Sequence, residues 1–250
     1  MADAAPGPAH AGKRAPTALT QLLGGTALLL AAALPLAAGA ATIDFDSLDP
    51  TIVFDQDTLV QNGMLLTGIG SNGGYAGAVV DGAAGDGLCS AMACPKGDNS
   101  HYYAALNDGA LTINAVAGGQ LIALRSFDAA FIGGDAGASY PLQAGLLTVV
   151  GVRADGTKMQ EQFGLAAQAD GSLRFGSYLS QSPFAGQGFA SLSFSGVACS
   201  QGQCSALGDN SGQFALDNLT ISAVPEPSAW LFLSAGLGLL AMLARRRPAA

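Results

Sequence analysis

The sequence predicts an all-β domain, a β-sandwich of jelly-roll type, between two apolar terminal segments. Three observations support this. Apolar and polar residues alternate in short segments, turns rich in Gly and Asp separate these segments, and residues 41–223 have no helical periodicity. An alternation of period two puts one set of side chains on each face of a strand. Short strands at regular spacing favour two packed sheets.

The N-terminal segment, residues 1–40, has the three parts of a secretory signal peptide. Lys13 and Arg14 precede an apolar stretch at residues 22–36, and Ala38-Gly39-Ala40 forms a cleavage site with small residues. A transmembrane helix is the alternative, but Pro35 and Gly39 interrupt the segment as a cleavage region would. The pattern therefore predicts export by the Sec route and removal of residues 1–40.

The strands follow in chain order. The first, residues 41–48, has Ile43 and Phe45 on one face and Asp44 and Asp46 on the other. The other predicted strands are residues 111–113, 121–124, 146–153, 158–165, 172–179, 189–194 and 213–221. Asp155-Gly156 predicts a tight hairpin turn between the third and fourth of these. The alternation slips at Asp217-Asn218, which predicts a β-bulge in the last strand.

The four cysteines form two equally spaced pairs, Cys89 with Cys94 and Cys199 with Cys204. Each pair is soon followed by the tetrapeptide Gly-Asp-Asn-Ser. A zinc site with four thiolates is the alternative, but disulfides are favoured in an exported protein. Local bonds within each pair are the simplest of the three possible connectivities.

The predicted domain, residues 41–223, carries a formal net charge of about −11, more negative than the −8 of the whole chain. Binding to nucleic acid or to anionic lipid depends on Lys and Arg, so this charge argues against both partners. Most of the acidic residues are Asp, which is common in turns and also binds calcium.

Residues for catalysis are scarce in this domain. His101 is its one histidine and Glu161 its one glutamate, and the sequence has no Gly-x-Ser-x-Gly or His-Glu-x-x-His motif. We therefore predict that the protein is not an enzyme. The single tryptophan, Trp230, lies outside the domain, so a platform for stacking sugar rings would have to use tyrosines. These are Tyr75, Tyr102, Tyr103, Tyr140 and Tyr178.

The C-terminal segment, residues 224–250, has three parts in a fixed order. Val224, Pro225, Glu226 and Pro227 come first, an apolar run follows, and Arg245, Arg246 and Arg247 stand near the end. At about 1.5 Å per residue, the apolar run has the length of a short transmembrane helix of roughly 26 Å. The arginines would hold its end on the cytoplasmic side.

These three parts together resemble the PEP-CTERM sorting signal of Gram-negative bacteria. The resemblance implies that exosortase, a transpeptidase embedded in the membrane, cuts near Val224–Pro227. The C-terminal helix would anchor the protein transiently in the inner membrane before processing. Afterwards the protein would be at the cell surface or outside the cell. The resemblance covers about a tenth of the chain.

The first and last strands carry a second resemblance, to sandwiches of the carbohydrate-binding-module type. It rests on Ile43-Asp44-Phe45-Asp46 and on residues 214–219, Phe-Ala-Leu-Asp-Asn-Leu. Residues 213–217 also fit a Gln-Phe-x-x-Asp pattern of one PEP-CTERM subgroup. In such sandwiches the terminal strands often pair and can hold a structural calcium ion, which implies Asp44, Asp46 and Asp217 as ligands.

The sequence thus predicts an exported, non-enzymatic protein of the cell surface or extracellular matrix, associated with biofilm exopolysaccharide. The alternative is a secreted protein that binds this polysaccharide, or a hydrolase that acts on it. Hydrolysis of glycosidic bonds needs a pair of carboxyl groups at a defined separation. A cleft with such a pair would favour the hydrolase.

Overall fold

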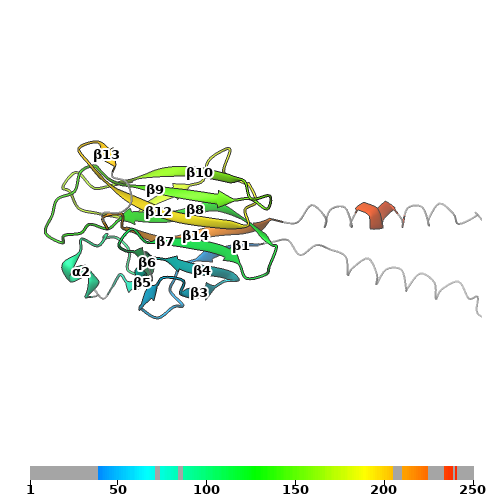
Figure 1. The fold of residues 1–250 in the computed structure, drawn as a ribbon, viewed down its shortest axis with the longest axis horizontal. Coiled ribbons are helices and arrows are strands. Elements are labelled where there is room, and N and C mark those ends of the chain that lie inside the picture. The colour runs from blue at the N-terminus through cyan, green and yellow to red at the C-terminus, as the bar shows by residue number, and fades with distance from the viewer. Residues whose placement is uncertain are drawn as a thin grey trace, which may run out of the picture. The chain divides into compact units, whose positions relative to one another are not determined.

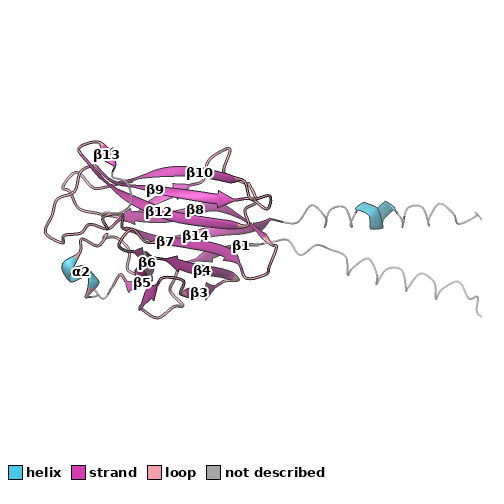
Figure 2. Cartoon of the chain, viewed as in Figure 1, coloured by secondary structure: helices cyan, strands magenta, loops and turns pink. Residues whose placement is uncertain are grey.

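The structure is a computed structural model that describes residues 39–70, 74–83, 87–204, 210–224, 234–238 and 240. Residues 39–224 contain the β-domain, drawn in Figures 1 and 2. Two antiparallel sheets of seven strands each build this domain. The predicted β-sandwich is confirmed.

Sheet A contains both ends of the domain. Its strand order is β11 (Gly176–Leu179), β8 (Leu121–Phe131), β14 (Phe214–Val224), β6 (His101–Ala105), β5 (Tyr75–Asp81) and β2 (Thr51–Phe54), with β1 (Ala40–Ile43) also paired to β14. The first and last strands therefore pair, as expected. Strand β14 is central, because β8 pairs with one of its edges and β6 and β1 share the other.

Sheet B packs against sheet A. Its strand order is β10 (Lys158–Ala166), β9 (Gln143–Val152), β12 (Ser191–Ser200), β7 (Ala110–Ala115), β4 (Met64–Ile69) and β3 (Thr58–Gln61), with β13 (Gln203–Cys204) paired to β12. The predicted hairpin is present, because β9 pairs with β10 across Asp155-Gly156, and Gly156 has a φ of 82°. From β6 to β9 the chain changes sheet at every strand, which ties the two layers together.

The main core fills the space between the sheets, as the alternation predicts. Strand β12 illustrates this: Leu192 and Phe194 are buried, whereas Ser193 and Ser195 between them are partly exposed. The ring of Phe127 lies at the centre of an aromatic cluster. Its centroid is 5.0 Å from that of Phe163, 5.5 Å from that of Tyr178 and 5.7 Å from that of Phe194.

Several predicted strands have different bounds in the structure. The first ends at Ile43 rather than at residue 48, because Phe45 adopts a left-handed φ of 55° that no strand can continue through. Phe45 is nevertheless buried, as predicted. The strand predicted at residues 172–179 begins at Gly176, and the one predicted at 189–194 begins at Ser191. The predicted bulge is present, since the register of β14 shifts after Asp217 and Asn218 has a φ of 49°.

A smaller apolar cluster covers part of the outer face of sheet A. It includes Val80, Tyr102, Ala104, Ala130 and Ala215. The loop after β5 packs onto it through Leu88 and Met92. This loop contains α2 (Leu88–Ala91), a single helical turn that the sequence pattern did not predict. The outer face of sheet A is therefore partly a second core rather than fully open to solvent.

The two ends of the domain lie at one end of sheet A. Ala40 pairs with Ser222, and β14 ends two residues later at Val224. At its other end, Phe214 pairs with Ala105, which in turn pairs with Gly77, next to the start of β5 at Tyr75. At about 3.3 Å per residue, β14 separates these two ends by roughly 30 Å. Figure 1 shows the loop with α2 at the end away from β1.

Candidate ligand-binding groove

Only one of the five candidate tyrosines presents a broad exposed face. Tyr102 and Tyr103 are buried, on opposite faces of β6. Tyr140 and Tyr178 are half-buried, and their hydroxyls donate hydrogen bonds to the carbonyl oxygens of Asp135 (2.8 Å) and Gly164 (2.9 Å). Tyr75 has half of its surface exposed, at 50%.

Phe54 is a second exposed aromatic residue, next to Tyr75. Strands β2 and β5 pair so that Phe54 lies opposite Tyr75, and the two rings stack with centroids 5.1 Å apart and planes inclined by 29°. Phe54 is also 46% exposed. We define Phe54 and Tyr75 as the aromatic platform. Sequence reasoning missed Phe54 because it considered only tyrosines. The alternation of exposed Ile52, buried Val53 and exposed Phe54 was the signal that could have found it.

A groove of about 480 Å³ begins at Tyr75 and extends over the outer face of sheet A. It is lined by Pro50, Thr51, Ile52, Tyr75, Gly77, Ala78, Val79, Leu88, Met92, Leu106 and Asn107. Ile52 presents 54% of its surface to solvent here. Gly77 and Ala78 contribute small residues to the floor. A side chain at position 77 would not fit, because its Cβ would lie 2.3 Å from the carbonyl oxygen of Ala104 and 2.6 Å from the buried Tyr103 hydroxyl. Most of the lining is apolar, with the Tyr75 hydroxyl and the Asn107 amide as polar groups.

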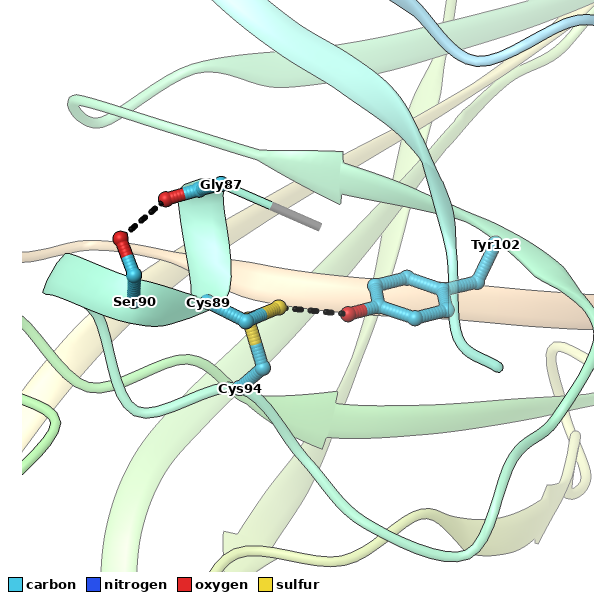
Figure 3. The surroundings of a disulfide bond; sticks show 5 residues. All are labelled: Gly87, Cys89, Ser90, Cys94 and Tyr102. Carbon is cyan, nitrogen blue, oxygen red and sulfur yellow. Dashed lines mark hydrogen bonds between the residues drawn. A yellow bond between two sulfur atoms is a disulfide. The ribbon is translucent and has the colours of Figure 1, made fainter. Parts of the chain in front are cut away.

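The first disulfide holds one wall of this groove. Cys89 and Cys94 are bonded, and their loop carries Leu88 and Met92 into the groove lining. Figure 3 shows Cys89 Sγ facing the buried Tyr102 hydroxyl at 3.8 Å, while Ser90 Oγ donates to the carbonyl oxygen of Gly87 at 2.7 Å. Because the bond ties α2 to Cys94, three residues after the end of the helix, we expect it to keep this wall in place.

The second disulfide joins Cys199 to Cys204 across the short pairing of β12 with β13. With both bonds formed, no cysteine of the chain is free. The structure therefore has the local pairing within each Cys pair, and the thiolate-zinc alternative has no thiolates to use.

The cysteines of the exported protein should accordingly be inaccessible to thiol reagents. We expect peptide mapping without reductant to find Cys89 linked to Cys94 and Cys199 linked to Cys204, and alkylation of all four only after reduction. The matched control is the same protein reduced before alkylation. Ready alkylation without reductant, or zinc that co-purifies in stoichiometric amount, would contradict the two bonds.

Asp108 fixes the position of its neighbour Asn107, one of the polar residues in the groove lining. Asn107 and Asp108 both adopt left-handed conformations, with φ of 54° and 57°. The Asp108 carboxylate accepts hydrogen bonds from the backbone N–H groups of Asn210 (2.9 Å) and Gly212 (2.7 Å). This clamp ties the turn after β6 to the segment before β14, so it sets the position of Asn107 at the groove.

The structure does not gather the three predicted calcium ligands into one group. Asp44 Oδ1 accepts a hydrogen bond from Gln61 Nε2 at 2.6 Å, and Asp46 Oδ1 accepts one from the His101 N–H at 2.9 Å. Both of these carboxylates are therefore engaged in tying the segment after β1 to other strands. Among the described residues, no cluster of three or more His, Cys, Asp or Glu side chains has the arrangement of a metal site.

Asp217 is different, because its carboxyl is fully buried on a central strand with one oxygen unsatisfied. Its Oδ2 accepts hydrogen bonds from Asn218 Nδ2 (3.0 Å) and Ser100 Oγ (3.3 Å), whereas its Oδ1 has no partner. Burial, with a smaller contribution from the neighbouring Asp98 carboxyl, raises the pKa of Asp217 to about 8. The observed acidic pair is thus Asp98 with Asp217, and the sequence analysis did not include Asp98.

The residues considered for catalysis have structural contacts. Glu161 accepts hydrogen bonds from Ser180 Oγ (2.9 Å) and from the Gln181 N–H (2.8 Å). His101 Nδ1 lies 2.8 Å from the carbonyl oxygen of Leu48. Neither residue lines the groove. Asp98 and Asp217 are in direct contact, so no sugar or water fits between their carboxyl groups as glycosidic hydrolysis would require.

A second cavity, of about 520 Å³, lies beside the same disulfide, between its loop and the turns at residues 136–140 and 170–173. Its lining includes Lys96, Tyr102 and Asp170. Tyr102 is buried and Tyr140 is held by Asp135, so this cavity has no broad exposed ring. We therefore regard the groove with the aromatic platform as the stronger candidate for recognition.

Comparison with known proteins identifies the C-terminal segment. Residues 223–247 match the family described as the PEP-CTERM protein-sorting motif. The chain carries a PEP-CTERM sorting signal. This signal marks an exported protein with a membrane-anchoring C-terminus, and it includes Val224–Pro227 and Arg245–Arg247. Its first two residues are also the last two of β14.

Comparison of the fold finds sandwich proteins at low identity. A DUF4465 family protein from Bacteroides caccae is 13% identical, with a TM-score of 0.49 over 74% of this chain and 100% of that chain. A second DUF4465 protein, from Bacteroides ovatus, is 11% identical, with a TM-score of 0.47 over 74% and 99%. A family 29 carbohydrate-binding module is 11% identical, with a TM-score of 0.35 over 72% and 99%. No curated protein matches the sequence.

The predicted signal peptide and most of the sorting signal lie outside the described residues. Residues 1–38, 225–233 and 241–250 belong to this part of the chain. The described part of the sorting signal after β14, residues 234–238 and 240, is helical. Within the described ranges, no helix has the length and apolar character needed to cross a membrane. The predicted transmembrane helix therefore stays a prediction.

Proposed function

We propose that this protein is a non-enzymatic component of the cell surface or extracellular matrix that binds polysaccharide through the groove and its aromatic platform. Exosortase would process it at the sorting signal. The observation that carries the binding role is the stacked and exposed pair of Phe54 and Tyr75 at one end of an apolar groove. Exposed apolar surface of this kind on an exported protein commonly marks a ligand site.

A sugar ring has the chemistry that this groove accommodates. One face of a pyranose presents C–H groups that pack on an aromatic ring, while its edge carries hydroxyls that need polar partners. The platform supplies the ring surfaces, and the Tyr75 hydroxyl and Asn107 amide supply polar groups next to an aliphatic floor. Large, rigid aromatic side chains also lose little conformational entropy when they bind.

The position of the groove is compatible with binding before and after processing. Both ends of the domain, at Ala40 and Val224, lie at one end of sheet A, and Tyr75 lies at the opposite end. The groove is therefore distant from Val224, the last residue of the domain. We propose that residues 1–40 are removed as a Sec signal peptide, that residues 41–223 form the mature domain, and that residues 224–250 act as the sorting signal.

A polysaccharide hydrolase is the rival function. It would need two carboxyl groups on either side of a bound glycosidic bond. None of the described residues that line the groove is an acid, and neither Asp98 nor the buried Asp217 belongs to its lining. These observations support a binding role over hydrolysis.

We also propose that the Asp98 and Asp217 carboxylates hold a structural calcium ion. The support is the buried, unpartnered Oδ1 of Asp217 and its contact with Asp98, since a bound cation would let both carboxyl groups ionise at neutral pH. Calcium takes six to eight oxygen ligands, so backbone carbonyls, amide oxygens or water would complete the set. Asp44 and Asp46 belong to the predicted site by sequence, but their observed partners are Gln61 and His101.

Polysaccharide binding can be tested by affinity electrophoresis of the exported protein in gels that contain soluble polysaccharides. We expect retardation by at least one polymer, and about a tenfold or greater loss of affinity in Tyr75→Ala, because truncation of an aromatic anchor removes about 1.4 kcal/mol or more. Leu179→Ala is the matched control, since Leu179 is also exposed but lies on β11, away from the groove. Equal retardation of Tyr75→Ala and the unchanged protein would contradict the proposed site.

A further inference from the structure

Among the residues that the structure describes, none that lines the groove is charged, although the domain has many acids. Its eleven lining residues are aliphatic, aromatic or neutral polar side chains. The five basic residues of the domain are Lys96, Arg125, Arg153, Lys158 and Arg174, and none of them lines the groove. A polyanionic ligand would therefore find no cation to pair with there.

Fixed carboxylates flank the Tyr75 end of the groove on two sides, because Tyr75 lies between Phe54 on β2 and the turn that follows β6. Beside the platform, Asp57 Oδ2 accepts a hydrogen bond from the Phe54 N–H at 2.9 Å, and Asp55 Oδ1 accepts one from the Gly70 N–H at 2.9 Å. On the other side of Tyr75, Asp108 is held next to Asn107 by its hydrogen bonds from Asn210 and Gly212. Because these bonds hold the carboxylates in place, their negative charge near the groove cannot rotate away from a ligand.

From this charge arrangement we infer that the groove selects uncharged, polyhydroxylated chains and excludes polyanions such as uronate polymers. The inference rests on the proposed polysaccharide binding and names the class of polysaccharide. An anionic chain would lose hydration on entry to an apolar surface and would meet only negative neighbours. A neutral chain needs no ion pair, so salt should not change its binding.

Ile52 is the position at which this selectivity can be altered. It lines the groove, lies on the edge strand β2 and is more than half exposed, so a longer polar side chain fits there without entering the core. Ile52→Lys would place a cation between the platform and the groove floor. Ile52→Gln is the matched control, with a polar chain of similar reach and no charge.

The test is affinity electrophoresis of the exported protein against galactomannan and hydroxyethyl cellulose as neutral polymers and alginate and polygalacturonate as polyanions. We expect retardation by at least one neutral polymer and by neither polyanion, unchanged between about 50 and about 500 mM NaCl. Ile52→Lys should gain retardation by alginate that salt removes, whereas Ile52→Gln should not.

Two outcomes separate this inference from the proposed function. Retardation of the unchanged protein by alginate that is lost in Tyr75→Ala would overturn the selection of neutral chains and leave polysaccharide binding in place. Retardation by none of the four polymers would overturn both. If alginate retards Ile52→Lys and Ile52→Gln equally, the groove does not control the selection, and the inference fails.

Discussion

Replacing Pro225, Glu226 and Pro227 by alanine is expected to abolish processing of the tail in a host that contains exosortase. The unchanged precursor should yield a mature protein without residues 230–250, whereas the variant should keep them and stay with the membrane fraction. The physical reason is that proline has a fixed φ and no backbone N–H, so Pro225 and Pro227 disfavour strand pairing, and a processing enzyme needs an unpaired segment. Intact-mass spectrometry of surface-released and membrane-bound protein measures the outcome.

The control is the unchanged gene in a host without exosortase, which should give the same full-length product as the variant. The motif begins where the folded domain ends, because β14 is hydrogen-bonded to β8 up to Val224. A cut after Val224 therefore leaves the folded domain complete. If the surface-located protein of an exosortase-containing host still carries residues 230–250, the segment is a permanent anchor and not a cleaved signal.

Calcium is expected to raise the melting temperature of the exported protein by about 5 °C or more. An ion that binds only the folded state at about 100 times its dissociation constant stabilises it by about 2.7 kcal/mol. For a domain of this size, each kcal/mol corresponds to about 2–4 °C. Chelation should remove the gain, and calcium should restore it where magnesium does not, because magnesium demands a stricter octahedral set of ligands.

Asp217→Asn should lose most of this response, because the amide keeps the shape of the side chain but removes its charge. Asp155→Asn is the matched control and should keep the response, since Asp155 lies in the turn between β9 and β10 on sheet B, away from Asp217. The readout is differential scanning calorimetry with chelator, calcium or magnesium. Melting temperatures that do not change with any of these, in protein shown to hold no metal, would leave Asp217 as a buried carboxyl without a metal.

Local pattern was sufficient to predict much of the fold. The Asp155-Gly156 turn between two alternating segments specified the β9–β10 hairpin, and the broken alternation at Asp217-Asn218 specified the bulge in β14. Such features depend on neighbouring residues only. The strands between residues 51 and 105 were not predicted, because several are short or rich in Gly and Ala. For example, β5 reads Tyr-Ala-Gly-Ala-Val-Val-Asp and is buried along most of its length.

The candidate groove could not be predicted, because it depends on contacts distant in sequence. Tyr102 appears as available as Tyr75 in the sequence, yet the disulfide loop buries it on the outer face of sheet A. The platform arises only when β2 pairs with β5. In the same way, Asp217 meets Asp98 because the loop before β6 reaches β14, whereas the sequence analysis grouped Asp217 with the acids of the first strand.

The most direct test of the account is a crystal structure of the exported protein with an oligosaccharide from the polymer that retards it most. We predict a sugar ring stacked on Tyr75 and Phe54 near Asn107, with further rings along the groove towards Ile52 and Thr51. An oligosaccharide bound instead in the cavity beside Lys96 and Asp170, with the platform vacant, would contradict the central claim that the groove on sheet A is the recognition site.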